Sequence, residues 1–261
     1  MAYAPPAAPR LTATGVSIRV PRRELVTGLD LDCEGGAFVG ILGANGAGKS
    51  MTLRTLAMLR EAAAGRVEIN GRVRSQWRRR DMARWLGMLP QATEDPFPAS
   101  VLETVLIGRH PHLDFWEWEG EADLQYARDA LARVDLAGME SRDLDSLSGG
   151  ERRRVAIAAL LAQDPRIAIL DEPTNHLDPH HQLQVLDLFR ARADRGDLVL
   201  ASLHDASLAA RYSDLVLLLY GDGGWSFGST ETTLTTQNLE RLYRSRVQEI
   251  HWEDRRVFVV G

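Results

Sequence analysis

The stretch GANGAGKS at residues 43–50 decides the fold. It follows Ala37–Leu42, a short apolar run that predicts a strand, and it leads into Lys49–Leu59, whose apolar residues have helical spacing. The stretch matches the pattern G-x-x-x-x-G-K-[ST] in full, in the strand–loop–helix context that this pattern requires. The sequence therefore predicts a phosphate-binding loop at the end of a strand.

Each residue type in this loop has a chemical reason. Gly43, Gly46 and Gly48 allow backbone angles that point successive N–H groups at phosphate oxygens. The helix that starts near Lys49 adds the positive end of its dipole, and the Lys49 ammonium supplies a charge for the β and γ phosphates. Ser50 supplies a hydroxyl ligand for Mg²⁺. The residues expected to contact the nucleotide here are Gly43, Ala44, Asn45, Gly46, Ala47, Gly48, Lys49, Ser50 and Met51.

Two acids follow a second apolar run. Residues 167–170 read IAIL, which predicts a buried parallel strand, and Asp171 and Glu172 come directly after it. Ligands bind at the carboxyl ends of strands in open α/β sheets. We expect Asp171 to hold Mg²⁺, directly or through water, and Glu172 to orient and polarise an attacking water. The pair also suits a solvated helix N-terminus, but the phosphate-binding loop favours the catalytic interpretation.

Composition narrows the class of protein. With 261 residues, 44% of them hydrophobic and 26% charged, the chain is typical of a soluble globular protein. Its net charge of −5 argues against a general nucleic-acid binder. Cys33 is the single cysteine, so no intrachain disulfide forms, which fits a reducing compartment. No apolar run approaches the ~18 residues that a membrane span needs, so we expect a cytoplasmic protein that reaches a membrane through a partner.

The pattern along the chain indicates an α/β fold. We expect a disordered tail at 1–10 and a single domain at 11–261, which begins with antiparallel strands in 11–35. Helical patterns dominate from about 92 to 165, as in a helical subdomain inserted between two strands of one sheet. Later strands and helices alternate, which is typical of a parallel sheet covered by helices. Expected elements are a strand at Arg66–Asn70 with an Asn-Gly turn, helices at Glu121–Val134, Gly150–Gln163, His180–Ala193 and from Ala206, strands at Ile167–Leu170, Leu198–Ser202 and Leu215–Tyr220, a short helix from Thr235, and a hairpin around Glu253–Arg256.

A third motif places these elements in a family. Residues 147–151 read LSGGE, about twenty residues before Asp171. This stretch looks like the signature of ABC nucleotide-binding domains, with Glu151 in place of the usual Gln. The order of motifs also resembles that family, and the resemblance covers nearly all of the chain after the tail. It implies an α/β P-loop NTPase core of the RecA type, an antiparallel β subdomain and an inserted α-helical subdomain.

The resemblance implies roles that the chemistry of single residues leaves open. Gln91 would touch Mg²⁺ or the lytic water and sense a membrane partner, although an isolated glutamine is ordinarily a surface residue. His204 would contact the γ-phosphate, although an isolated histidine is ordinarily structural. The implied catalytic residues are Glu172, His204 and Gln91, and the implied metal ligands are Ser50, Gln91 and Asp171.

The signature implies a site shared between two copies of the chain. Ser148, Gly149 and Gly150 would bind the γ-phosphate held by the opposite subunit, with Ser148 also capping the following helix. Asp178 would lie at the dimer interface and would also cap a helix before Pro179. ATP on one copy needs the signature of the other, so the resemblance implies a twofold, head-to-tail dimer with MgATP as its cofactor.

Further residues narrow the kind of transporter. The segment 88–113 and the motif Asp178–Gln182 resemble the ATPases of iron-siderophore, haem and cobalamin importers, in which G-R-x-P-H follows the helix after Gln91, as Gly108–His112 does here. This resemblance implies a peripheral protein at the cytoplasmic face of the inner membrane. Its partners would be two integral-membrane permease subunits and, indirectly, a periplasmic or extracellular substrate-binding protein, with no nucleic acid. The Trp-Glu-rich stretch 115–121 either favours corrinoid uptake or forms an amphipathic surface loop. An exporter ATPase and a soluble ABC protein acting on nucleic acid are the alternatives.

The sequence also departs from the family pattern. The region 16–23 has no aromatic residue to stack on adenine, so Ile18, Val20 or an arginine is expected to pack on the base instead. Met51 replaces the common Thr without removing the metal ligand at Ser50. The basic runs 78–80 and 152–154 are expected to form solvated helix faces, and 78–80 could instead approach lipid headgroups or a membrane partner.

Overall fold

The computed structural model describes residues 8–261 except 22, 92–97, 115 and 254. Most of the tail expected at 1–10 lies outside the described residues, and the first strand begins at Arg10. The first six residues of the expected helical subdomain, 92–97, also lie outside them, as does residue 115 of the Trp-Glu-rich stretch.

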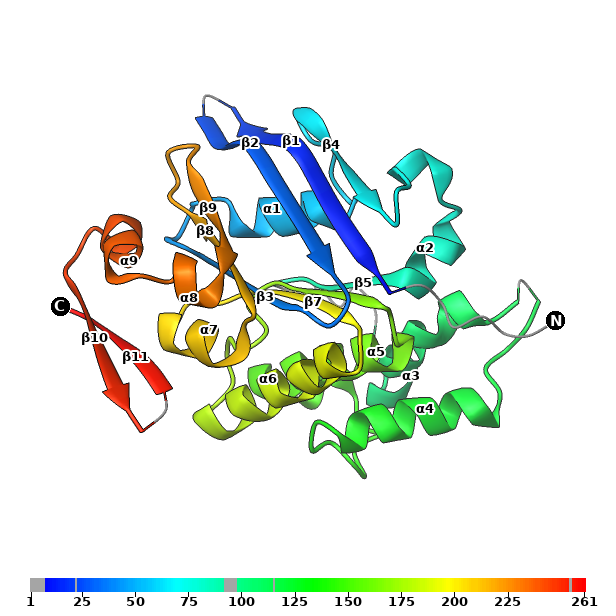
Figure 1. The fold of residues 1–261 in the computed structure, drawn as a ribbon. Coiled ribbons are helices and arrows are strands. Elements are labelled where there is room, and N and C mark those ends of the chain that lie inside the picture. Colours follow the sequence, from blue (N-terminus) through cyan, green and yellow to red (C-terminus); the bar gives the residue numbers. More distant parts are fainter. Residues whose placement is uncertain (1–7, 22, 92–97, 115, 254) are drawn as a thin grey trace.

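A six-stranded sheet forms the centre of the fold, with the strand order β5-β6-β7-β3-β8-β9 (Figure 1). The first five strands are parallel to their neighbours, and only β9 is antiparallel, to β8. The strands are β3 (Phe38–Gly43), β5 (Leu86–Leu89), β6 (Ile167–Leu170), β7 (Leu198–Ser202), β8 (Leu215–Leu219) and β9 (Trp225–Ser229). The expected parallel sheet is therefore confirmed, whereas β5 and β9 are strands that the sequence pattern did not reveal.

The side chains of this sheet alternate between two hydrophobic clusters. In β6, Ile167 and Ile169 pack toward the β1–β2–β4 side, whereas Ala168 and Leu170 pack toward the helices. Because successive side chains of a strand point to opposite faces, a sheet that is covered on both sides needs apolar residues at every position. That requirement explains the uninterrupted apolar runs of the central strands.

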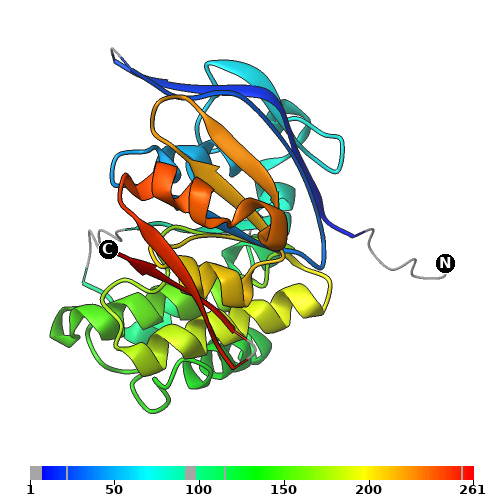
Figure 2. The same cartoon turned by 60° about the vertical axis from the view of Figure 1, so that its left-hand side comes forward.

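A second sheet lies over one face of the central sheet. It has the order β2-β1-β4 and is antiparallel, with β1 at Arg10–Val20, β2 at Arg23–Glu34 and β4 at Ala64–Ile69. The helix α1 (Lys49–Leu56) lies between the two sheets (Figure 2). The expected turn after β4 is present, since Asn70 and Gly71 both have positive φ, at 51° and 69°.

Helices cover the other face, and most of them belong to an insertion between β5 and its neighbour β6. The insertion packs α3, η2 and α4 against α5, and its long helices match the expected ranges to within two residues. The elements of this layer are α3 (Val101–Leu106), the 3-10 helix η2 (Ile107–His112), α4 (Glu121–Ala132), η3 (Leu144–Ser146) and α5 (Gly149–Gln163), followed after β6 by α6 (Pro179–Asp194) and α7 (Ala206–Tyr212).

The remaining elements lie at the edges. Between β4 and β5 the chain forms the 3-10 helix η1 (Arg74–Gln76) and the short helix α2 (Arg79–Trp85). The C-terminal part forms α8 (Thr230–Thr233), α9 (Thr236–Tyr243) and the expected hairpin of β10 (Val247–Trp252) and β11 (Arg255–Val260), which packs against α7. Within the described ranges, no helix is both long and apolar enough to cross a membrane.

Candidate functional site

The phosphate-binding loop joins the end of β3 to the start of α1, as expected. Gly46 and Gly48 have φ angles of 77° and 105°, which residues with a side chain rarely adopt. A Cβ at Gly43 would lie 2.9 Å from the carbonyl oxygen of Leu219, so this position also requires glycine. The loop backbone is therefore shaped by its glycines to expose N–H groups toward a bound anion.

Lys49 is the buried cation of the loop. Its side chain is 5% exposed and its Nζ donates a hydrogen bond to the Gly43 carbonyl, 2.9 Å away. Burial lowers the pKa of Lys49, while the negative charges of Glu172 and Asp171 act in the opposite direction. A buried ammonium group with neighbouring carboxylates is poised to attract the negative charge of phosphate groups.

Glu172 is the centre of the site. Its carboxylate lies 2.7 Å from Nε2 of His204 and accepts a hydrogen bond of 2.8 Å from Nε2 of Gln91. Nδ2 of Asn175 also donates to it, and Nζ of Lys49 lies 4.0 Å away. The structure thus brings together Gln91, Glu172, His204 and Lys49, four of the residues predicted from the sequence.

Asp171 lies beside this cluster and is fully buried. Its Oδ1 accepts a hydrogen bond of 2.9 Å from the hydroxyl of Ser202, which in turn accepts one of 2.8 Å from the Glu172 amide. Its Oδ2 is buried and has no hydrogen-bond partner among the residues that the structure describes. A buried carboxylate oxygen without a partner is costly unless a cation or water satisfies it, so the geometry fits an expected ligand of Mg²⁺.

The signature residues lie apart from this cluster. The cavity at the loop, about 480 Å³ in volume, is lined by Leu25, Asn45, Gly46, Gly48, Lys49, Ser50, Met51, Gln91, Glu172, Asn175 and His204. In the described part of the chain, Ser148, Gly149, Gly150 and Asp178 do not line it. Ser148 and Gly149 are exposed at the start of α5, where they are accessible to another molecule.

Both expected helix caps are present. The hydroxyl of Ser148 accepts from the Glu151 amide, while the Glu151 carboxylate accepts from the Ser148 amide at 2.8 Å. The hydrogen bonds that the Ser148 hydroxyl and amide donate to the Glu151 carboxylate hold the pKa of Glu151 below its usual value. Asp178 caps α6 by accepting from the His181 amide at 3.0 Å. Glu151, which replaces the usual Gln, therefore retains the capping role at this position.

Of the residues expected to pack on adenine, Ile18 needs a correction. Ile18 is fully buried in the core between the sheets and cannot pack on a base. Leu25 from β2 lines the cavity, close to Gly48. The sequence analysis did not single out Leu25 or Asn175, because nothing in a single Leu or Asn signals a role.

The basic run 152–154 was expected to form a solvated helix face. This expectation is wrong for Arg153, which is only 5% exposed. Its guanidinium donates to the carbonyl oxygens of Pro90, Asp171 and Glu172 at 2.6, 2.6 and 2.8 Å. Burial lowers the pKa of Arg153 to about 10, against the effect of Asp171 and Glu172. Helical spacing could have predicted the burial of Arg153, because residue 153 is four positions before the buried Ile157 and so lies on the same face of the helix.

The fold and the cavity define a P-loop ATPase. The model of the ABC transporter family matches residues 26–175, and the chain belongs to this family as an ATP-binding subunit. It is 42% identical over 220 residues to the hemin import ATP-binding protein HmuV of Streptomyces coelicolor, covering 82% of this chain and 77% of that protein. It is 38% identical over 238 residues to HmuV of Pseudomonas entomophila, covering 89% and 92%.

A solved structure agrees with the sequence relatives. An inward-facing metal-chelate type ABC transporter is similar to this chain with a TM-score of 0.83 and 27% identity, covering 97% of this chain and 98% of that one. The expected ABC nucleotide-binding fold is therefore confirmed.

Replacing Arg153 by Met should destabilise the protein. The substitution leaves buried carbonyl groups without donors, so we expect the free energy of unfolding to fall by about 3 kcal/mol in denaturant titration. The matched control is Arg152→Met, which removes only a surface contact to Asp145 and should change the free energy by less than about 0.5 kcal/mol. Equal effects of the two substitutions would contradict the assigned role of Arg153.

Proposed function

We propose that this chain hydrolyses MgATP to drive import of a metal chelate, haem in particular, across a membrane. The convergence of Gln91, His204 and Lys49 on the Glu172 carboxylate carries the hydrolytic part of the proposal. The import part rests on the family and on relatives that are named as hemin import proteins. Both of these sequence relatives are named as import proteins, which favours import over export.

Glu172 acts as the general base in this proposal. Its carboxylate accepts hydrogen bonds, so it can align a water for in-line attack on the γ-phosphate and receive its proton. His204 and Gln91 hold the carboxylate from two sides and prevent its rotation away from the phosphate. Lys49 turns from the Gly43 carbonyl toward the β and γ phosphates, where its charge offsets that of the transition state.

The residues present fit Mg²⁺, an ion that prefers oxygen ligands and keeps several waters. Asp171 with its unpartnered Oδ2, the Ser50 hydroxyl and the Gln91 amide oxygen would hold it together with phosphate oxygens. The ion supplies charge neutralisation on the β and γ phosphates. The described residues contain no cluster of three or more His, Cys, Asp or Glu that could hold a metal. Phosphate oxygens and waters would complete the coordination of the ion.

A second copy of the chain completes the site. Ser148 and Gly149 are exposed at the N-terminus of α5, a position that suits binding of a γ-phosphate held by the partner. Asp178, exposed at the start of α6, would lie at the same interface. Because each copy carries both halves, the complementary arrangement is a twofold dimer with two nucleotides between the subunits.

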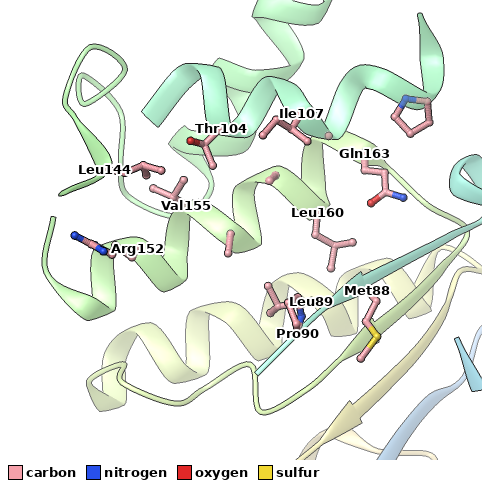
Figure 3. A pocket seen from close by; sticks show the side chains of 14 residues that line it. Met88, Leu89, Pro90, Thr104, Ile107, Leu144, Arg152, Val155, Leu160 and Gln163 are labelled. Carbon is pink, nitrogen blue, oxygen red and sulfur yellow. The ribbon is translucent and has the colours of Figure 1, made fainter. Parts of the chain in front are cut away.

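A separate cavity suits the permease. It has a volume of about 410 Å³ and lies between the end of β5 and the helices α3, η2 and α5 (Figure 3). Its lining is mainly apolar and includes Leu89, Ile107 and Val155, with Ile107 58% exposed. Pro90 lines it directly before Gln91, so an apolar helix of a membrane subunit seated here would adjoin the catalytic glutamine. We assign the chain to the cytoplasmic face of the membrane as a peripheral subunit on this basis.

The substrate assignment can be tested by transport. Proteoliposomes that contain the chain, its permease and its binding protein should take up haem in an ATP-dependent manner, with at least about tenfold preference over cobalamin and ferric siderophores. The Lys49→Ala variant serves as control and should abolish uptake, because the phosphates lose their buried cation. Preferential uptake of cobalamin or of a siderophore would contradict the haem assignment.

The permease cavity can be tested by Ile107→Glu. A carboxylate in an apolar interface is costly to bury, so permease-stimulated ATP hydrolysis should fall by about tenfold or more, whereas the isolated chain keeps its rate. The matched control is Ile250→Glu on β10, which exchanges another exposed isoleucine and should leave stimulation intact. Full stimulation of Ile107→Glu would place the permease elsewhere.

A further inference from the structure

A surface beside the permease cavity combines positive charge with exposed tryptophans. Its first part is the basic segment, residues 72–84, which carries six arginines and the single acid Asp81 in a chain with a net charge of −5. Its second part is the Trp loop, residues 116–120, in which Trp116 and Trp118 are 89% and 87% exposed. Neither part contributes to the nucleotide site.

The two parts are joined by direct contacts. Arg80 forms an ion pair of 3.2 Å with Asp114, directly before the Trp loop, and its Nε donates to the Pro111 carbonyl at 3.1 Å. Arg84, one turn further along α2, donates to the same carbonyl at 2.7 Å. Arg80, Trp116 and Trp118 line one hollow, so the basic segment and the Trp loop form one surface.

Much of the positive charge on this surface is not neutralised. Arg78 and Arg79 are exposed at the start of α2 and form no ion pair within the described residues. In the described part of the chain, the hydrogen bonds of Arg74 and Arg84 go to carbonyl oxygens, which are uncharged, and neither arginine forms an ion pair there.

The carboxylates near the Trp loop have partners within the protein, although Asp114 and Glu117 are exposed. Asp114 pairs with Arg80, and Glu119 lies 3.4 Å from Nε2 of His110. Glu117 accepts a hydrogen bond of 2.8 Å from the Asp114 amide. The charge on this surface is positive on balance, because the six arginines of the basic segment outnumber the four carboxylates Asp81, Asp114, Glu117 and Glu119.

The position of the surface indicates which way it faces. Pro111, which receives the hydrogen bonds of Arg80 and Arg84, also lines the permease cavity. This step rests on the proposed function: if a permease seats in that cavity, the adjoining surface faces the bilayer. Figure 1 shows α2 and the start of α4 on the same side of the molecule, away from the C-terminal hairpin.

We propose that the basic segment and the Trp loop bind directly to an anionic lipid surface, in addition to the contact with the permease. Arginines near an anionic leaflet gain favourable electrostatic energy, and indole rings partition into the headgroup region. The lipid contact holds the subunit at the membrane and orients the permease cavity toward its partner. The ligand is the phosphate headgroup of an anionic lipid in a bilayer.

The test is vesicle binding by the purified chain. Vesicles of phosphatidylcholine with 30% phosphatidylglycerol, against phosphatidylcholine alone, are mixed with protein at ~50 and ~300 mM salt and separated by flotation. We expect binding only to the anionic vesicles, weakened by salt because of charge screening. The double variant Arg78→Glu/Arg79→Glu should weaken binding by at least about 20-fold, at about fivefold for each arginine lost.

Controls separate the proposed surface from general charge. The matched variant Arg244→Glu/Arg246→Glu changes two exposed arginines after α9, on the other side of the molecule, and should bind as the wild type does. Brominated lipids should quench the fluorescence of the wild type, and Trp116→Ala/Trp118→Ala should lose that quenching. The ATPase rate in solution should be unchanged in Arg78→Glu/Arg79→Glu, which shows that the variant is folded.

Three outcomes would overturn the lipid proposal. The first is that the wild type fails to bind anionic vesicles. The second is that Arg78→Glu/Arg79→Glu and Arg244→Glu/Arg246→Glu weaken vesicle binding equally. The third is that single-stranded RNA displaces the chain from vesicles at concentrations well below those of lipid, which would make the surface a nucleic-acid site. A chain that binds vesicles as expected but shows neither ATPase activity nor a response to permease would instead contradict the proposed function, so the two failures are distinguishable.

Discussion

Parallel pairing of four neighbouring strands is the constraint on which the rest of the structure depends. The sheet order β5-β6-β7-β3 places the carboxyl ends of four strands in a row. Gln91 follows the first, Asp171 and Glu172 the second, His204 the third, and the phosphate-binding loop the fourth. Because parallel strands end at the same edge, residues more than a hundred positions apart in sequence meet at one carboxylate.

The charged side chains that meet at this edge are buried, so their contacts with one another matter for stability. Lys49 and Glu172 are both almost fully buried, and each is costly to bury without partners. Lys49 bonds to Gly43 and neighbours Glu172, while Glu172 is held by His204, Gln91 and Asn175. These contacts satisfy the buried charges of Lys49 and Glu172 within the chain, and bound phosphate groups would displace part of this pairing. Arg153 donates hydrogen bonds both to the segment that follows β5 and to the segment that follows β6, and so links the two segments.

Much of the fold could be predicted from the sequence, because long apolar runs and glycine-rich loops report backbone requirements directly. The strands Ile167–Leu170 and Leu198–Ser202 have their predicted bounds. The strand β5 was missed because LGML is short and contains a glycine, and β9 because its pattern WSFGS mixes apolar and polar residues. Tertiary pairing with β6 and β8 decides both, and that information is not local.

Some residues of the candidate site could likewise be predicted from the sequence, and others could not. Glycines, the lysine and the acids of the motifs have residue types that the chemistry requires, so their positions could be predicted. Leu25, Asn175 and Ser202 could not, because their contribution arises from where the fold places them and not from their type. The burial of Arg153 could be predicted only in part. Its position in the helical repeat predicts a buried residue, whereas its charge predicts an exposed one.

The central claim is that two copies complete each other's nucleotide site and that Glu172 is the general base for hydrolysis of the ATP held there. Size exclusion of Glu172→Gln with MgATP tests this most directly, with Lys49→Ala beside it. The account predicts that Glu172→Gln elutes as a dimer with two bound ATP molecules per dimer and that Lys49→Ala elutes as a monomer. If Glu172→Gln stays monomeric with ATP bound while the wild type hydrolyses ATP, the shared site and the role of Glu172 are contradicted.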